Sequence, residues 1–594
     1  MLLALLFAAS IPAEEVQLLA GSLRPEGRAE LEENAAPIAA LPLSEVQAEL
    51  DPAKARIDGQ LRLVVRNRER AAWPEIVLRL YPQAQRGTSL KISEVLLDGK
   101  KAPLRVHGSV ASITTALPPG AEAVITLRFQ GALRRLREGE DDPLGGAQGL
   151  LSQLSPGMGA LSGKPAADKG YATFAVGPRG ATLVDWYPQL AARARGGWDK
   201  DEPGALGDVA HADPGSAVVA LTVPRGWRVA GAGSPLGQHA LDGGKETAAF
   251  ASAGVRGALG LVASPEFSEE VEDAHGVQLR ASSLHGERGA KALLSCARTA
   301  LEALQQRFGP YPWSSLSIAE AALTGGAGGV ELPGLAIVAQ ALSPRVNTGV
   351  VPSGLFDFTC YHEVAHQWWQ AVVGSDPRRA PWVDEALAQY SAVLVSEAAR
   401  GGGEAGRAAA EQALGTYVTL NYQGMRMANV ADGRVARPAD DFRSPLAYAG
   451  LVYGKAPLFF GKARELMGEE KFDQACRAYR RSWAFREAGA GAWLVAAQRA
   501  DPQHAAELAA LERRWWEEKH GDQDIGQPDA LALMDALGGG GNGFSQLMHM
   551  LQKPGGGSPQ DLQQALKELE RLMPELSRML QDGQGDSSGD EQDE

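Results

Sequence analysis

Hydrophobic and polar positions alternate in short runs through residues 44–283, the pattern of β-strands that bury one face. Two clear runs are 59–66 (GQLRLVVR) and 217–223 (AVVALTV), and both are rich in β-branched residues. Turn sequences such as Asp98-Gly99 separate the runs. We therefore expect residues 14–285 to form an antiparallel, all-β domain.

The pattern becomes helical near Gly289. Apolar residues repeat at helical spacing over 290–307 (AKALLSCARTALEALQQR), and Gly309-Pro310 then ends the predicted helix. Helical patterns dominate the chain from there to residue 520. We expect a second, mainly α-helical domain over residues 286–520.

The chain after this domain has a looser composition. Glycine runs occur at 538–541 and 555–557, and a helical apolar stripe over 561–580 is interrupted by Pro574. The last residues are acidic. We expect residues 521–594 to form a flexible, Gly-rich and partly helical acidic tail.

Composition limits the classes of function. The chain has 58 Lys and Arg against 72 Asp and Glu, a formal net charge of −14. This balance argues against nucleic acid as a partner, because phosphate binding needs clustered basic residues. A length of 594 residues exceeds what one core supports, so two or more domains are expected. Three cysteines, Cys296, Cys360 and Cys476, lack paired metal-ligand spacing, and we interpret them as small buried residues.

The first 13 residues (MLLALLFAASIPA) contain a short apolar run followed by small residues. This resembles a signal peptide and favours export to the periplasm or outside the cell, although no Lys or Arg precedes the run. An ordinary buried segment, and a cytoplasmic protein, is the alternative. No later run reaches the roughly 18 apolar residues of a membrane span, so we expect no integral membrane segment.

Metal-ligand chemistry is concentrated in 361–369 (YHEVAHQWW). On a helix His362 and His366 are four residues apart and project from one face, which suits two positions on tetrahedral Zn²⁺. Glu363 lies beside the first histidine and can activate a water molecule without binding the metal. For this motif alone, two ordinary histidines on a helix are the alternative.

A third ligand is predicted at Glu385, which 18 residues separate from His366. Two histidines and one glutamate, with a fourth position open for water, are typical of a catalytic rather than a structural zinc site. The sequence therefore predicts one Zn²⁺ per chain.

Three further segments extend the pattern in a consistent order: 308–313 (FGPYPW), 328–334 (GGVELPG) and 447–455 (AYAGLVYGK). With the zinc motif, residues 44–520 resemble the gluzincin family of zinc aminopeptidases that includes aminopeptidase N and leukotriene hydrolase. The resemblance implies an N-terminal β saddle followed by a thermolysin-like domain. It also implies a zinc metallo-aminopeptidase that hydrolyses the N-terminal peptide bond of peptides with a free N-terminus.

The resemblance also implies residue roles. Glu331 would bind the substrate α-amine, in a substrate-binding segment with Gly328, Gly329 and Val330. Tyr453 would donate a hydrogen bond to the developing oxyanion, and Tyr448 is the weaker candidate for this role.

This chain departs from the family at several positions. Leu332 replaces the usual Asn, Val330 the usual Met, and Asp384 a common Asn before the third ligand. Residues 521–594 are too few for the large C-terminal helical domain of many members. These departures leave open a zinc endopeptidase on the same scaffold. A non-catalytic interaction protein is the more distant alternative, and the sequence predicts neither the oligomeric state nor the preferred N-terminal residue.

Overall fold

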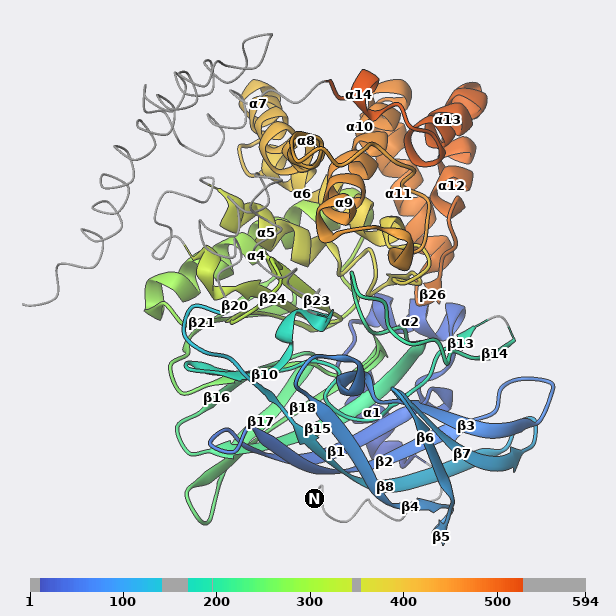
Figure 1. Ribbon diagram of the computed structural model, residues 1–594, viewed down its shortest axis with the longest axis vertical. Helices are drawn as coiled ribbons and strands as arrows, with labels where there is room; N and C mark the ends of the chain where they lie inside the picture. Colours follow the sequence, from blue (N-terminus) through green and yellow to red (C-terminus); the bar gives the residue numbers. More distant parts are fainter. Residues whose placement is uncertain (1–10, 141–168, 195, 344–353, 527–594) are drawn as a thin grey trace, which may run out of the picture.

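The computed structural model describes residues 11–140, 169–194, 196–343 and 354–526. Figure 1 shows a β-rich N-terminal part and a mainly helical C-terminal part, which confirms the predicted order of the two. Most of the predicted signal peptide (1–13) and of the predicted tail (521–594) lies outside the described residues.

The largest sheet of the N-terminal part has eight strands in the order β17-β18-β15-β1-β2-β8-β4-β5. Neighbouring strands are antiparallel except β1 and β15, which pair in parallel. A long crossover joins these two strands, as parallel pairing requires. The strands are β1 (Leu43–Asp51), β2 (Arg56–Arg66), β4 (Ser89–Leu97), β5 (Lys100–Lys101), β8 (Glu122–Ala132), β15 (Pro214–Pro224), β17 (Ser234–Leu241) and β18 (Lys245–Arg256).

Smaller sheets pack beside the large one. One has the order β16-β19-β11-β10-β9, another β12-β3-β7-β6, and a third is the pair β13-β14. Their strands are β3 (Trp73–Arg79), β6 (Leu104–His107), β7 (Val110–Leu117), β9 (Arg134–Arg135), β10 (Phe174–Gly177), β11 (Gly180–Leu183), β12 (Gln189–Leu190), β13 (Arg193–Ala194), β14 (Gly197–Trp198), β16 (Arg228–Gly231) and β19 (Leu261–Ser264).

A separate five-stranded sheet belongs to the C-terminal part, with the order β20-β21-β22-β24-β23. The change of sheet therefore falls at Ser268, before the boundary of 285/286 placed by the helical pattern. Strand β23 lies at the edge of this sheet and pairs with β24 in antiparallel register. The strands are β20 (Ser268–Ala274), β21 (Val277–Ser283), β22 (Ser315–Ala321), β23 (Gly329–Leu332) and β24 (Leu335–Ala339).

Helices cover this sheet and fill the rest of the C-terminal part (Figure 1). The predicted helix over 290–307 is α4 (Gly286–Phe308), and Gly309, at φ 103°, follows its last residue. The other helices are α5 (Leu355–Ala365), α6 (Trp382–Ala398), α7 (Gly403–Ala413), α8 (Leu420–Met427), α9 (Pro445–Tyr448), α10 (Ala456–Met467), α11 (Glu469–Trp483), α12 (Ala492–Ala500), α13 (Ala505–Glu512), α14 (Gly521–Asp524) and the π-helical turns η6 (Leu414–Thr419), η8 (Ala449–Lys455) and η10 (Arg513–Glu517).

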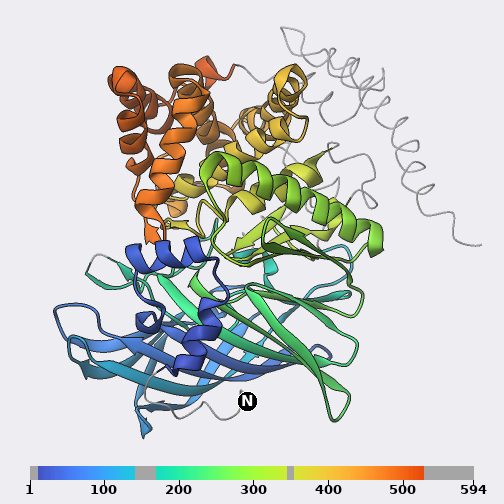
Figure 2. The ribbon, with the colours of Figure 1, turned by 180° about the vertical axis from the view of Figure 1, so that it is seen from behind.

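The two parts share one hydrophobic core, because the largest cluster of buried apolar residues includes members of both. Of the two N-terminal helices, α2 (Pro25–Asn34) lies at the junction, and α1 (Ala13–Ala20) packs against β18 of the large sheet (Figure 2). Arg480 of α11 forms a two-bond ion pair with Glu30 of α2, at 2.7 and 2.9 Å. Within the described ranges, none of the helices combines the length and apolar character needed to cross a bilayer.

Candidate metal centre

The three predicted ligands converge at the ends of two packed helices. His362 lies in the last turn of α5, His366 caps that helix, and Glu385 lies in the first turn of α6. The Nε2 atoms of the two histidines are 3.0 Å apart, and Glu385 Oε2 is 3.3 Å from each. All three side chains are buried.

This spacing fits zinc. Ligand atoms about 2.05 Å from a tetrahedral ion lie about 3.3 Å from one another, close to the three observed separations. Burial alone would raise the pKa of Glu385, but hydrogen bonds and charge from His362 and His366 lower it below its usual range. The carboxylate is thus held ionised, as a metal ligand must be.

A backbone contact orients one of the imidazoles. His366 Nδ1 lies 2.9 Å from the carbonyl oxygen of Trp369 and donates its proton there. This tautomer leaves the Nε2 lone pair free to bind a metal ion in the space between the three ligand atoms.

Glu363 lies where a proton acceptor is needed, beside the ligand cluster and against strand β23. Burial raises its pKa to about 8, and a bound dication would lower it again. A Cβ atom at Gly329 would lie only 2.4 Å from Glu363 Oε1. Residue 329 is therefore glycine because the carboxylate occupies the space of a side chain.

Tyr453 lies in the π-helical turn η8, a conformation frequent at functional sites. Its hydroxyl donates to Glu385 Oε1 at 2.5 Å, and its ring centroid is 5.9 Å from that of His362. Tyr448 is buried, whereas Tyr453 is half-buried, and their ring centroids are 5.8 Å apart. The Tyr448 hydroxyl has no hydrogen-bond partner among the described residues. Tyr453 is thus the tyrosine in contact with the ligand cluster.

Glu331 extends from the edge strand β23 toward the same centre, with Oε1 3.8 Å from His366 Nδ1. It meets Asp208, a residue that the sequence analysis did not single out. The two carboxyl groups are hydrogen-bonded to each other, which requires that one of them is protonated. Burial raises the pKa of Glu331 to about 7, and burial together with Glu331 raises that of Asp208 well above its usual range. Asp208 belongs to a loop of the N-terminal part, and no local motif marks it.

The remaining predicted positions lie along the same strand. Gly328 accepts a hydrogen bond from the backbone N–H of Ala339 at 2.8 Å, and Val330 is buried. Leu332 is buried against Gly260 of the N-terminal part, where an added Cβ would lie 2.4 Å from Leu332 Cδ1. The apolar residue in place of the family Asn therefore packs between the two parts of the chain.

Asp384 is buried beside the third ligand. Its Oδ1 accepts the backbone N–H of Glu385 at 2.9 Å, and burial and the charge of Glu385 raise its pKa to about 7. With Glu331 and His366 it forms a second group of potential ligand atoms, which shares His366 with the first.

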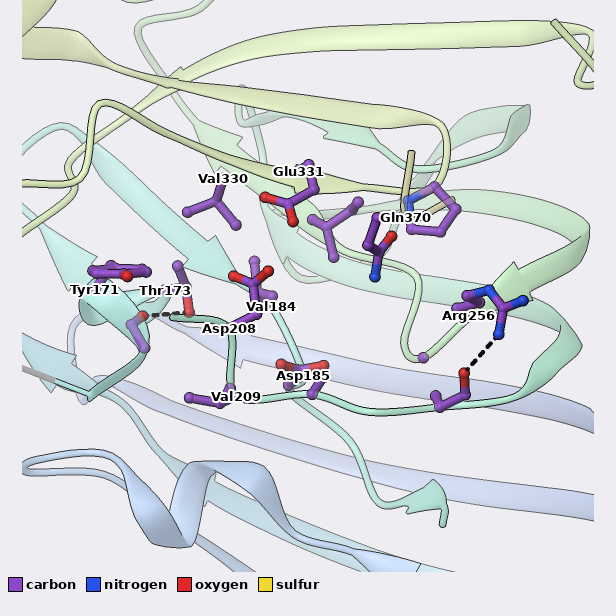
Figure 3. A pocket seen from close by; sticks show the side chains of 16 residues that line it. Tyr171, Thr173, Val184, Asp185, Asp208, Val209, Arg256, Val330, Glu331 and Gln370 are labelled. Atoms are coloured by element: carbon purple, nitrogen blue, oxygen red, sulfur yellow. Dashed lines mark hydrogen bonds between the residues drawn. The ribbon is translucent and has the colours of Figure 1, made fainter. Parts of the chain in front are cut away.

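A cavity opens beside Glu331, between β23 and the N-terminal part (Figure 3). Glu331 and Asp208 lie near each other on its wall. Arg256 lies at another end, and Gln370 is between Glu331 and Arg256 in this view. Its other lining residues include Tyr171, Thr173, Val184, Asp185, Val209, Val330, Leu332 and Pro333.

Comparison with known proteins agrees with this geometry. Residues 294–515 match the model of the peptidase family M1 domain. A comparison with curated protein sequences found no match. Among solved structures, a mutant M1 zinc metallopeptidase from Deinococcus radiodurans is 18% identical with a TM-score of 0.55, covering 82% of this chain and 98% of its own.

Two further structures agree. The M1 zinc metallopeptidase from Deinococcus radiodurans is 19% identical with a TM-score of 0.53, covering 80% of this chain and 93% of its own. A two-domain M1 zinc metallopeptidase mutant bound to L-arginine is 18% identical with a TM-score of 0.55, and the match covers 81% of this chain and 94% of that one. At these identities the likeness shows the fold, while the family model identifies the domain. Residues 294–515 therefore match a peptidase family M1 domain, and the fold of the chain is that of the M1 zinc metallopeptidases.

Proposed function

We propose that this protein is a zinc-dependent aminopeptidase that removes the first residue of peptides with a free N-terminus. The observation that carries the proposal is the half-buried pair of Glu331 and Asp208 beside the ligand cluster. Two carboxylates in contact repel each other when both are ionised. A substrate ammonium placed between them removes this repulsion and forms two charge-assisted hydrogen bonds. The first peptide bond then lies next to His362, His366 and Glu385.

The edge strand supports an extended substrate. Within the described residues β23 pairs with one neighbour, β24, so its other edge is available to a peptide backbone. The carbonyl of Leu332 already accepts Gln367 Nε2 at 3.0 Å, which limits this open edge to the part of the strand before it. Gly328, Gly329 and Val330 lie in or next to that part.

The chemistry follows from the arrangement. His362, His366 and Glu385 would hold Zn²⁺, which when bound would supply a Lewis acid for the scissile carbonyl and for water. Glu363 accepts a proton from the attacking water and passes it to the leaving amine. Tyr453, whose hydroxyl is within reach of the cluster, donates a hydrogen bond to the carbonyl oxygen as negative charge develops there.

Bound molecules in the similar structures support the substrate class. One of those mutant structures is bound to L-arginine, another to L-tryptophan, and a third to a Tyr-Ser-Ala substrate. An amino acid is the product of an aminopeptidase, and a tripeptide with a free amine is its substrate.

The experiment compares kcat/KM for one fluorogenic peptide with a free and with an acetylated N-terminus. The acetylated peptide lacks the two charge-assisted hydrogen bonds of the ammonium, so kcat/KM should be about 10²-fold or more higher for the free peptide. Glu331→Ala and Asp208→Asn should each narrow this ratio. Glu397→Gln is the matched control, because Glu397 is a buried carboxylate of α6 that pairs with Arg464 at 3.0 Å, away from the cavity.

Equal turnover of the free and acetylated peptides by the wild type would contradict the aminopeptidase proposal and favour the endopeptidase alternative. A high ratio that survives both substitutions would place the amine anchor elsewhere.

A further inference from the structure

Arg256, the last residue of β18, is a buried cation on the wall of the cavity that Glu331 and Asp208 also line (Figure 3). Arg256 is 7% exposed. Nη1 donates to the carbonyl oxygen of Ala212 at 3.2 Å. Nε and Nη2 have no hydrogen-bond partner in the part of the chain that the structure describes. A buried guanidinium with two unpartnered donors is unfavourable unless another group satisfies them.

The unpartnered edge of Arg256 has the geometry for a carboxylate. Elsewhere in this structure the Nε and Nη2 atoms of an arginine bind both oxygens of one carboxylate, as in Arg193 with Glu69 at 2.6 and 2.7 Å. Arg426 binds Asp522 in the same way, with both bonds at 2.7 Å. Among the described arginines that are partly unpartnered, Arg256 combines a free Nε with a free Nη2. Its guanidinium face lies against Gly374, where a Cβ would be 2.3 Å from Arg256 Cζ, so the edge rather than this face remains for a ligand.

Gln370 adds a second polar group to this end of the cavity. Its backbone has φ 117°, a conformation that favours glycine, and Val373 holds it by accepting its N–H at 2.8 Å. The side chain lines the cavity, and its Oε1 is without a partner among the described residues. The strained residue thus presents an amide between the carboxyl pair and Arg256 (Figure 3).

We propose that Arg256 is the anchor for an acidic side chain on the first residue of the substrate, so that the preferred peptides begin with Glu or Asp. This inference rests on the proposed aminopeptidase function. Glu331 and Asp208 hold the α-ammonium at one end of the cavity. The side-chain carboxylate of the same residue then extends past Gln370 to the Nε and Nη2 atoms of Arg256. A first residue with an ammonium at one end and a carboxylate at the other matches the carboxyl pair and the guanidinium along the cavity wall.

Asp185 lines the same cavity and offers the competing preference, for a basic side chain. Its Oδ1 already accepts Gln189 Nε2 at 2.8 Å, and burial raises its pKa to about 6. Asp185 therefore has a hydrogen-bond partner and a raised pKa, whereas the Nε and Nη2 edge of Arg256 has no partner among the described residues, and its guanidinium stays charged although burial lowers its pKa. The comparison of acidic with basic first residues decides between the two.

The test measures kcat/KM of the zinc-loaded enzyme on one fluorophore carrying Glu, Gln or Lys as the first residue. Glu and Gln are nearly isosteric, so their ratio isolates the charge. A two-bond ion pair with Arg256 should make kcat/KM for the Glu substrate about ten- to a hundredfold higher than for the Gln substrate. Arg256→Gln should bring this ratio close to one. Arg480→Gln, which removes a buried guanidinium from the Glu30 pair far along the chain, should leave the ratio as in the wild type.

A Glu/Gln ratio near one in the wild type overturns the inference, as does faster turnover of Lys than of Glu. A high ratio that persists in Arg256→Gln also overturns it. The acetylated Glu substrate separates this inference from the proposed function. If acetylated and free Glu substrates turn over equally, the aminopeptidase proposal itself fails, whereas a Glu/Gln ratio near one with a strong need for the free amine sinks the Arg256 anchor alone.

A binding measurement covers the case in which Arg256→Gln does not fold. The zinc-loaded Glu363→Gln protein, which keeps Arg256, is titrated with L-glutamate and with L-glutamine by calorimetry. At least tenfold tighter binding of L-glutamate supports the anchor, and equal affinities overturn it.

Discussion

Gly329 gives the sharpest test of the catalytic geometry, because the structure supplies the size of the perturbation. In Gly329→Ala the new Cβ would lie 2.4 Å from Glu363 Oε1 and 2.5 Å from its Cδ. Ordinary contacts of a Cβ begin near 3.4 Å, so the carboxylate must retreat by about 1 Å. A misplacement of this size reduces turnover by about 10²-fold. We expect kcat to fall by about that factor, while zinc content stays at the wild-type level.

The assay is kcat on a free-amine fluorogenic substrate, with zinc measured by elemental analysis. Gly328→Ala is the neighbouring control, since its Cβ would make a 3.4 Å contact with Thr359, and its loss should be much smaller. The decisive comparison is a double-mutant cycle. If the alanine acts through Glu363, then adding Gly329→Ala to Glu363→Gln should cost far less than adding it to the wild type.

Two results would refute the reasoning. Turnover of Gly329→Ala within threefold of the wild type would mean that the close approach of residue 329 to Glu363 is absent in the working enzyme. Equal losses in the wild-type and Glu363→Gln backgrounds would show that the alanine acts on substrate binding rather than on the carboxylate.

Three other predictions follow from the same structure. Glu385→Ala should lose zinc, because two imidazoles alone bind weakly, and full zinc occupancy would contradict its assignment as the third ligand. Tyr453→Phe should lower kcat by about 10²-fold, whereas Tyr448→Phe should lower it less, and the reverse order would exchange their roles. His211 Nε2, in the N-terminal part of the chain, lies 2.7 Å from Glu487 Oε2 in the C-terminal part. Burial lowers the pKa of His211, but the hydrogen bonds that its ring donates to Asp199 and Glu487 raise this pKa overall to about 10. A raised pKa contributes stability that is fully present below the unfolded value of 6.5 and is lost as pH rises through about 10. Glu487→Gln should therefore lower the free energy of unfolding in urea more at pH 6 than at pH 10. Equal losses at the two pH values would contradict an ion pair between His211 and Glu487.

Local sequence predicted those features of the site that depend on short-range geometry. The spacing of His362 and His366 places both rings on one face of a helix whatever the rest of the chain does, because the helical repeat fixes it. Glu363 follows from the same repeat. Glu385, Glu331 and Tyr453 came from recognisable motifs in the right order, and the structure brings all of them to one centre.

Other features arise from contacts between residues far apart in the chain, and no periodicity encodes such contacts. Strands β20 and β21 read as part of the β domain because their alternation resembles that of any half-buried strand, and only their pairing with β22 assigns them to the second sheet. The packing of Leu332 on Gly260 is likewise invisible in either segment.

The sequence by itself predicted the fold class, the candidate ligand set and the candidate proton acceptor, since helical and strand periodicities and short motifs are local properties. Only the tertiary structure decided that Asp208 meets Glu331, and that Arg256 and Gln370 line the same cavity. These residues come from loops and strand ends of separate parts of the chain. The folding of one part against the other sets their distances, and with them the charges that a substrate meets.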